Sequence, residues 1–222
     1  MGQCEKMENK KYVYVVLSQT PTKFGRLIRN RTNTKYNHAS ISFDENMEQL
    51  YSFGRAQHSV PVKAGLVKEF RERFSLNQID YVACKVYKIP VSKEDYYHGL
   101  EIVNDIMSDP DGYLYNLFSV LTYPMFHGFS TYKTFTCVEF TAHMLKCMNV
   151  KWKSNRPDCK YMPEQLGEEL EEWYHYEGNL LDVLEPSPEE SEFYFEKPNY
   201  FTKTWISIWV LLRLGYRKMR YL

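Results

Sequence analysis

Two short segments, HASISF (38–43) and EQLYSFGR (48–55), restrict the fold more than any other part of the chain. Apolar and polar side chains alternate in the first segment, and a period of two is typical of a β-strand with two different faces. The faces hold Ala39, Ile41 and Phe43 on one side and His38, Ser40 and Ser42 on the other. The intervening DEN (44–46) is a turn signal, and the second segment reads as the returning strand, ended by Gly54. We therefore expect a β-hairpin.

Apolar periodicity elsewhere predicts further strands and helices. The segments rich in Val and Tyr predict strands at 11–18 and at 78–90, the second closed by Pro90. Helical spacing predicts one or two turns around Phe24, Leu27 and Ile28, and longer helices at 92–109, 112–126, 136–149 and 163–173. We expect Ser92 to cap the first long helix, and Pro124 to end the second.

The C-terminal part of the chain has a different composition. Residues 185–192, EPSPEESE, are typical of a linker. Residues 199–222 are apolar and then basic, but their uninterrupted apolar stretch is far shorter than the roughly 20 residues that cross a bilayer. Two interpretations remain open: a strand or helix docked on the core, or an interfacial membrane anchor. The anchor would use Trp205 and Trp209 with a basic cluster of Arg213, Arg217, Lys218 and Arg220.

Size and charge narrow the functional classes. The 222 residues suffice for one domain with a real core, and the net charge is zero. A balanced chain offers no electrostatic case for nucleic-acid binding, which usually shows as a basic stripe. The 19 tyrosines suit half-buried walls and clefts, because tyrosine joins a large apolar ring to a polar tip.

The cysteines argue against a disulfide framework or a zinc ribbon. Their number is five, which is odd, and no CxxC pair is present. We expect free thiols in a reducing compartment, the cytoplasm, with no metal and no cofactor. The N-terminus has no apolar core of a secretory signal, and Lys6 disfavours acylation of Gly2.

Cys137 differs from the other cysteines in its position. A turn-like, polar segment precedes FTCVEFTAHML (135–145), so a helix is expected to begin at Thr136 or Cys137. A thiol at that point experiences the positive end of the helix dipole and unpaired backbone N–H groups, both of which favour the nucleophilic thiolate. The alternative is a purely structural role, in which the cysteine packs as a small apolar side chain. This interpretation fits Cys84, Cys147 and Cys159.

His38 is the histidine best placed to serve that thiol. It begins a strand after a polar loop, on a face lined by small serines. A nearby imidazole would accept the thiol proton and later give it to a leaving group. The alternative is a surface histidine at the start of a strand. His143 follows Cys137 by six residues and lies roughly on the opposite side of the same helix, so its imidazole cannot meet the Cys137 thiol.

In their order, KYNHASISFD, LYSFGR and FTCVEFTAHML resemble the NlpC-like superfamily of papain-fold thiol hydrolases. The resemblance is to its circularly permuted branch, in which the histidine strand precedes the cysteine helix. That branch includes relatives of lecithin retinol acyltransferase and many uncharacterised bacterial proteins. The resemblance implies an α+β fold over residues 11–184, with an antiparallel sheet packed against helices and the cysteine at a helix N-terminus. Residues 1–10 would be a flexible N-terminus and 185–222 a C-terminal extension.

The same resemblance assigns roles to individual residues. Cys137 matches the nucleophile and His38 its general base. The family places a third polar residue, which orients the imidazole, on the strand after the histidine strand. Ser52 is the best match here, with Tyr51 as the alternative, although neither is the usual residue type. A serine hydroxyl orients an imidazole but does not stabilise its charge as a carboxylate does.

These features predict a cysteine hydrolase or acyltransferase that cleaves an amide or ester through an acyl-cysteine intermediate. Peptides, amides and lipid esters are the substrate classes that the resemblance implies, and the apolar, basic tail favours a substrate at a membrane surface. The alternative is a non-catalytic binding or scaffold protein that retains the fold, which the atypical third residue favours.

Overall fold

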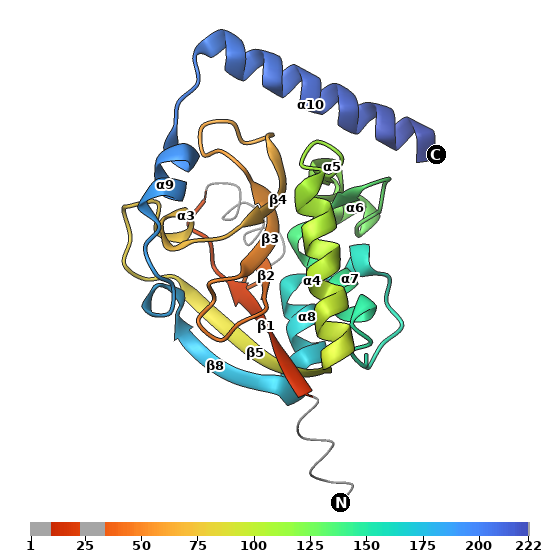
Figure 1. Cartoon of the computed structure of the whole chain (residues 1–222). Helices are drawn as coiled ribbons and strands as arrows, with labels where there is room; N and C mark the ends of the chain where they lie inside the picture. The colour runs from red at the N-terminus through yellow and green to blue at the C-terminus, as the bar shows by residue number, and fades with distance from the viewer. Residues whose placement is uncertain (1–9, 23–33, 222) are drawn as a thin grey trace, which may run out of the picture.

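A six-stranded antiparallel sheet forms the centre of the molecule (Figure 1). The computed structural model describes residues 10–22 and 34–221; the expected helical turns around Phe24 and most of the N-terminal segment 1–10 lie outside these ranges. The strand order is β4-β3-β2-β1-β5-β8, and every neighbouring pair is antiparallel. The strands are β1 (Lys10–Ser18), β2 (His38–Ser42), β3 (Leu50–Arg55), β4 (Ala64–Lys68), β5 (Ala83–Ser92) and β8 (Tyr174–Asn179).

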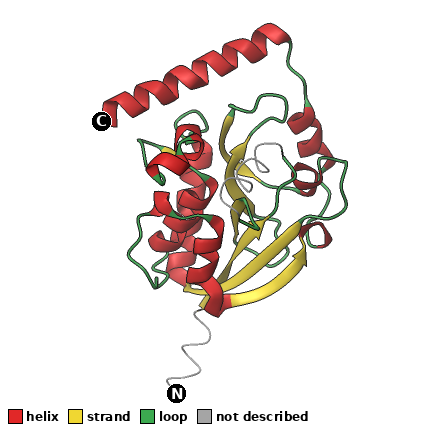
Figure 2. Ribbon diagram, turned by 180° about the vertical axis from the view of Figure 1, so that it is seen from behind, coloured by secondary structure: helices red, strands yellow, loops and turns green. Residues whose placement is uncertain are grey.

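Helices cover one face of this sheet, as the two opposite views show (Figures 1 and 2). They are α4 (Lys93–Ser108), α7 (Cys137–Cys147) and α8 (Pro163–Leu170). Apolar side chains of β1 alternate between two cores: Val13, Val15 and Leu17 pack towards these helices, whereas Tyr14 and Val16 pack on the other face. A strand buried on both faces needs a continuous apolar run, which explains the composition of β1. The fold is therefore α+β, as expected.

The hairpin and the helix that follows Pro163 are confirmed, and so is the cap of α4. β2 pairs with β3, and the Ser92 hydroxyl accepts a hydrogen bond from the backbone of Asp95. β5 continues past Pro90, where the prediction ended it. Pro90 pairs with Tyr12 of β1 but lies beyond residues 83–87, the part of β5 that β8 covers. One side of the strand is free there, so the missing N–H breaks no ladder.

The single helix expected at 112–126 is wrong. The segment instead holds β6 (Leu114–Tyr115), α5 (Leu117–Leu121) and α6 (Tyr123–Phe126), which includes Pro124. β6 forms a two-stranded parallel sheet with β7 (Thr134–Phe135). The cause is local: the Asn116 side chain accepts the backbone N–H of Ser119 and so starts α5 after the strand.

The C-terminal extension forms two helices. The expected linker falls largely within α9 (Pro188–Phe195), and Tyr194 of this helix is buried against Phe70 and His58. The last helix, α10 (Tyr200–Tyr221), lies across one end of the molecule (Figure 1). None of the helices in the described part of the chain combines the length and apolar character that a bilayer crossing requires. The remaining short elements are α3 (Arg71–Ser75) and three 3₁₀ turns at 158–160, 171–173 and 180–182.

Candidate active site

Cys137 is the first residue of α7, and a complete capping box fixes the helix start. The Thr136 hydroxyl accepts the backbone N–H of Glu139 at 3.1 Å, and the Glu139 carboxylate accepts the backbone N–H of Thr136 at 3.2 Å. This reciprocal pair holds the first turn, so the free amides near Cys137 keep a fixed direction. Burial is the main reason that the pKa of Glu139 is raised to about 7.

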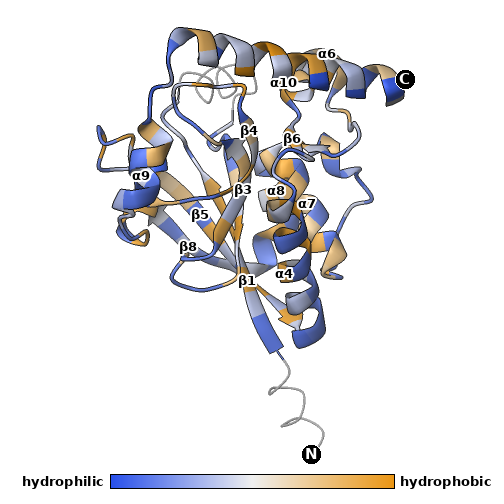
Figure 3. Cartoon of the chain, turned by 45° about the horizontal axis from the view of Figure 1, so that its top comes forward, coloured by the Kyte–Doolittle hydropathy of each residue, from blue (hydrophilic) through white to orange (hydrophobic). Residues whose placement is uncertain are grey.

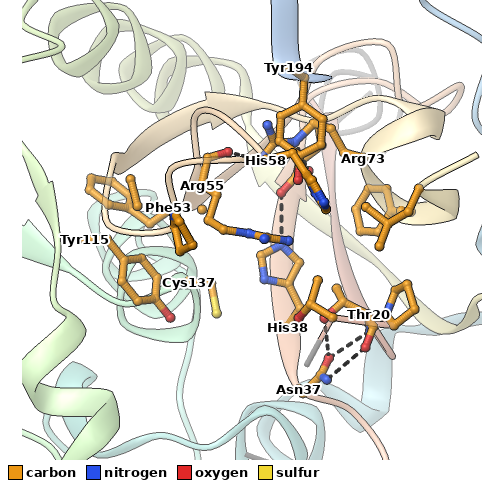
Figure 4. Close-up of a pocket in the computed structure, with 18 of the residues that line it drawn as sticks. Thr20, Asn37, His38, Phe53, Arg55, His58, Arg73, Tyr115, Cys137 and Tyr194 are labelled. Atoms are coloured by element: carbon orange, nitrogen blue, oxygen red, sulfur yellow. Dashed lines mark hydrogen bonds and ion pairs between the residues drawn. The ribbon is translucent and has the colours of Figure 1, made fainter. Parts of the chain in front are cut away.

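His38 begins β2, next to the start of α7, and its ring is directed into the same region as the Cys137 thiol (Figure 4). Its side chain retains 12% exposure, and the Cys137 residue 6%. Nε2 of His38 lies 2.9 Å from a carboxylate oxygen of Glu69. The other ring nitrogen, Nδ1, is thereby left for the thiol. The structure thus brings together the two residues that the sequence singled out.

Glu69, rather than Ser52 or Tyr51, is the group that contacts the imidazole. The Ser52 hydroxyl donates to the same carboxylate oxygen that faces His38, so it orients the carboxylate and not the ring. Tyr51 lies on the opposite face of β3, where it packs on the helix-side core near Phe43. The predicted third residue is therefore corrected from a serine to a carboxylate, which can also stabilise an imidazolium.

Arg73 holds the second oxygen of Glu69. Arg73 follows Glu69 by four residues, and its Nε donates to that oxygen at 2.8 Å. Its Nη2 donates to the carbonyl of Arg55 at 2.6 Å. The guanidinium also lies 4.5 Å from the centre of the Tyr194 ring. Burial alone would raise the pKa of Glu69, but Arg73 and then His38 outweigh it and hold that pKa well below its usual range. Glu69 is thus an anion.

The thiol and the imidazole stabilise each other's charged forms. Burial lowers the pKa of His38, but interactions with Cys137 and then with Glu69 outweigh it and raise that pKa to about 10. Burial raises the pKa of Cys137, whereas His38, followed by the backbone amides of Ala39 and Val138, lowers it below its ordinary value. The pair therefore favours thiolate and imidazolium, the form that attacks a carbonyl carbon.

Tyr115 flanks the thiol on the side away from His38 (Figure 4). The pairing of β6 with β7 places it there, because Tyr115 is opposite Phe135, two residues before Cys137. Burial and then the charge of Cys137 raise the pKa of Tyr115 well above its ordinary value, so the phenol stays protonated and can donate a hydrogen bond. Sequence reasoning missed this residue, since its segment looked helical.

A cavity of about 620 Å³ adjoins these side chains. Cys137, His38 and Tyr115 line one side of it, and residues such as Arg55 and His58 line it further out. Arg55 extends into the cavity and has no acidic partner among the residues that the structure describes (Figure 4). The cavity can therefore hold a ligand of moderate size, with a cation near its wall.

The remaining cysteines have settings of other kinds. Cys84 is fully buried in the core on the far face of the sheet. Cys147 lies at the end of α7, 3.6 Å from Nε2 of His143, whose other nitrogen is 3.5 Å from Asp158. This second cysteine–histidine contact lies at the C-terminal end of the helix, away from the backbone amides at the helix start that surround Cys137. His143 is therefore paired with Cys147 and Asp158 rather than with Cys137.

Comparison of the chain with models of protein families, with curated proteins and with solved structures finds no match.

Proposed function

We propose that the protein is a cysteine hydrolase or acyltransferase with a circularly permuted papain-like fold, which cleaves an amide or ester bond. The observation that carries the proposal is the contact of a helix-start thiol with an imidazole that is itself bonded to a buried carboxylate. The order of the chain supports the permuted arrangement, since the histidine strand β2 precedes the cysteine helix α7. The non-catalytic alternative drew on the atypical third residue and on the aromatic richness of the chain, and the Glu69 carboxylate beside His38 argues against the first of these grounds.

In the first half-reaction, the Cys137 thiolate attacks the carbonyl carbon and an S–C bond forms. The resulting oxyanion accepts hydrogen bonds from the backbone amides at the start of α7 and from the Tyr115 hydroxyl. The C–O or C–N bond of the substrate then breaks, and the His38 imidazolium gives its proton to the leaving alcohol or amine. Glu69 stabilises the imidazolium before this step and fixes its tautomer afterwards.

In the second half-reaction, the thioester is resolved. Water attacks its carbonyl in a hydrolase, whereas an alcohol or amine acceptor attacks in an acyltransferase. Neutral His38 removes the proton from the attacking group, and the S–C bond breaks to return the thiolate. Because this chemistry needs a reduced thiol, we expect the protein to act in a reducing compartment such as the cytoplasm.

The proposal is tested by trapping the acyl-enzyme. We expect a panel of activated thioesters and esters to add one acyl group to Cys137, detected as a mass increase of the peptide that contains it. Comparing the acylation rates of paired substrates that differ only in a carboxylate would show whether Arg55 contributes to substrate binding. Cys137→Ala should abolish the adduct, whereas Cys147→Ala should leave it unchanged. An adduct spread over several cysteines, or none on Cys137, contradicts the proposed role.

The Tyr115 hydroxyl is expected to contribute to the rate. Removal of one oxyanion donor typically costs two to three orders of magnitude in kcat, so Tyr115→Phe should lower kcat by roughly 100-fold with little change in KM. Tyr113→Phe is the matched control, because Tyr113 lies two residues away and stacks on Phe135. Equal kcat values for the two variants would remove Tyr115 from the mechanism.

A further inference from the structure

The outward face of α10 is a continuous apolar stripe. Its members are spaced at three and four residues over most of the helix, so they share one side. They are Phe201, Trp205, Ile208, Trp209, Leu212, Tyr216 and Met219, each between 49% and 84% exposed. Figure 3 shows orange, hydrophobic segments alternating with blue ones along this helix. A water-soluble surface rarely carries a patch of this extent unless something covers it.

The inward face fixes which side of α10 points outward. Val210 and Leu214 are buried against Leu114, with Val62 and Leu117 packed around them. Arg217 donates to the carbonyls of Lys133 and Gly112, both at 2.8 Å, and Arg213 donates to the carbonyl of Asp111. The helix is therefore held against the body, and turning the stripe inward would break these contacts.

The charge of α10 indicates what covers the stripe. The segment 200–222 contains five basic residues and no acidic one. The basic residues are Lys203, Arg213, Arg217, Lys218 and Arg220. Arg213 and Arg217 are bound to the body of the protein, so they add to the positive field of the helix and do not contact the lipid directly. Tryptophan and tyrosine are the side chains enriched at the level of lipid headgroups, and a cationic helix is attracted to an anionic leaflet. The helix does not span a bilayer, so this combination suits a helix that lies in the plane of the interface.

We propose that α10 is an interfacial helix that docks the protein on an anionic lipid bilayer, with the apolar stripe inserted among the acyl chains near the headgroups. The inference does not depend on the nucleophilic role of Cys137. The position of α10 is nevertheless linked to the cavity beside Cys137, because Val62 and Leu117 line that cavity and also pack against α10. Docking would thus place one wall of the cavity about one helix diameter from the lipid surface.

The test uses the full chain and vesicles of phosphatidylcholine, with or without phosphatidylserine. We expect co-sedimentation and a blue shift of tryptophan emission with the anionic vesicles, much weaker binding to the neutral ones, and a decrease with added salt. The double variant Trp205→Glu and Trp209→Glu should lose about tenfold or more of the anionic-vesicle binding. Both side chains are mostly exposed, so the variant should keep the melting temperature of the wild type.

Tyr97→Glu is the matched control. Tyr97 is also an exposed aromatic side chain on a helix, but it lies in the first turns of α4, whereas α10 contacts Asp111 and Gly112 beyond the other end of α4. It should bind vesicles like the wild type. The proposal is overturned if the wild type fails to bind anionic vesicles, or if Tyr97→Glu loses as much binding as the double variant. The proposal is also overturned if the wild type is a dimer and the only effect of the double variant is to make it monomeric. In that case a second copy of the chain, and not a bilayer, covers the apolar stripe.

Discussion

At pH 6, iodoacetamide is expected to alkylate Cys137 one to two orders of magnitude faster than an ordinary thiol. A thiol with a pKa near 8.5 is only about 0.3% thiolate at that pH, whereas the interaction with His38 favours the thiolate of Cys137. The lower basicity of such a thiolate offsets part of this gain. The rates are measured by mass spectrometry of the cysteine-containing peptides at short reaction times.

The variant that tests the cause is His38→Ala. Without the imidazole, only the helix start and the backbone amides lower the pKa of Cys137, so alkylation at pH 6 should slow by about tenfold or more. Cys147 is the internal control, since it also contacts a histidine but at the C-terminal end of α7. Equal rates at Cys137 and Cys147 in the wild type, or an unchanged rate at Cys137 in His38→Ala, would contradict the proposed ion pair.

The second large effect concerns stability. Glu69→Ala should lower the free energy of unfolding by about 3–5 kcal/mol, because it leaves the guanidinium of Arg73 buried without its partner. The two side chains are only 4% and 8% exposed. Denaturant titration followed by circular dichroism measures the change. Glu45→Ala is the control: the Glu45 carboxylate that pairs with Lys88 is 63% exposed, and this ion pair should contribute less than about 1 kcal/mol.

The effect of Glu69→Ala on the free energy of unfolding should depend on pH. The folded-state pKa of Glu69 lies below its unfolded value. The stabilisation is therefore complete above the unfolded pKa, near pH 4.5, and is lost as the pH falls below it. The stability difference between wild type and Glu69→Ala should shrink in acid. A difference below about 1 kcal/mol at neutral pH would show that the buried network contributes little.

The candidate site was predictable only where its signal is local. Cys137 was found because a polar turn precedes an amphipathic helix, and His38 because it begins an alternating strand. Glu69 was missed because it follows β4, a strand that no sequence pattern revealed, and reaches His38 across β3 from 31 residues away. Tyr115 was missed for a different reason: an apolar segment containing Leu114 and Leu117 resembles a helix until the pairing with β7 is known.

The contact between Arg73 and Tyr194 has a consequence for biosynthesis. During translation, β2, β3 and α7 leave the ribosome before α9, so the thiol and the imidazole can meet before Tyr194 packs against the guanidinium. Tyr194 joins Phe70 against the guanidinium of Arg73 only after α9, which follows α7 in the chain, has been synthesised and has docked. Until α9 docks, the packing around the guanidinium that holds the second oxygen of Glu69 is therefore incomplete.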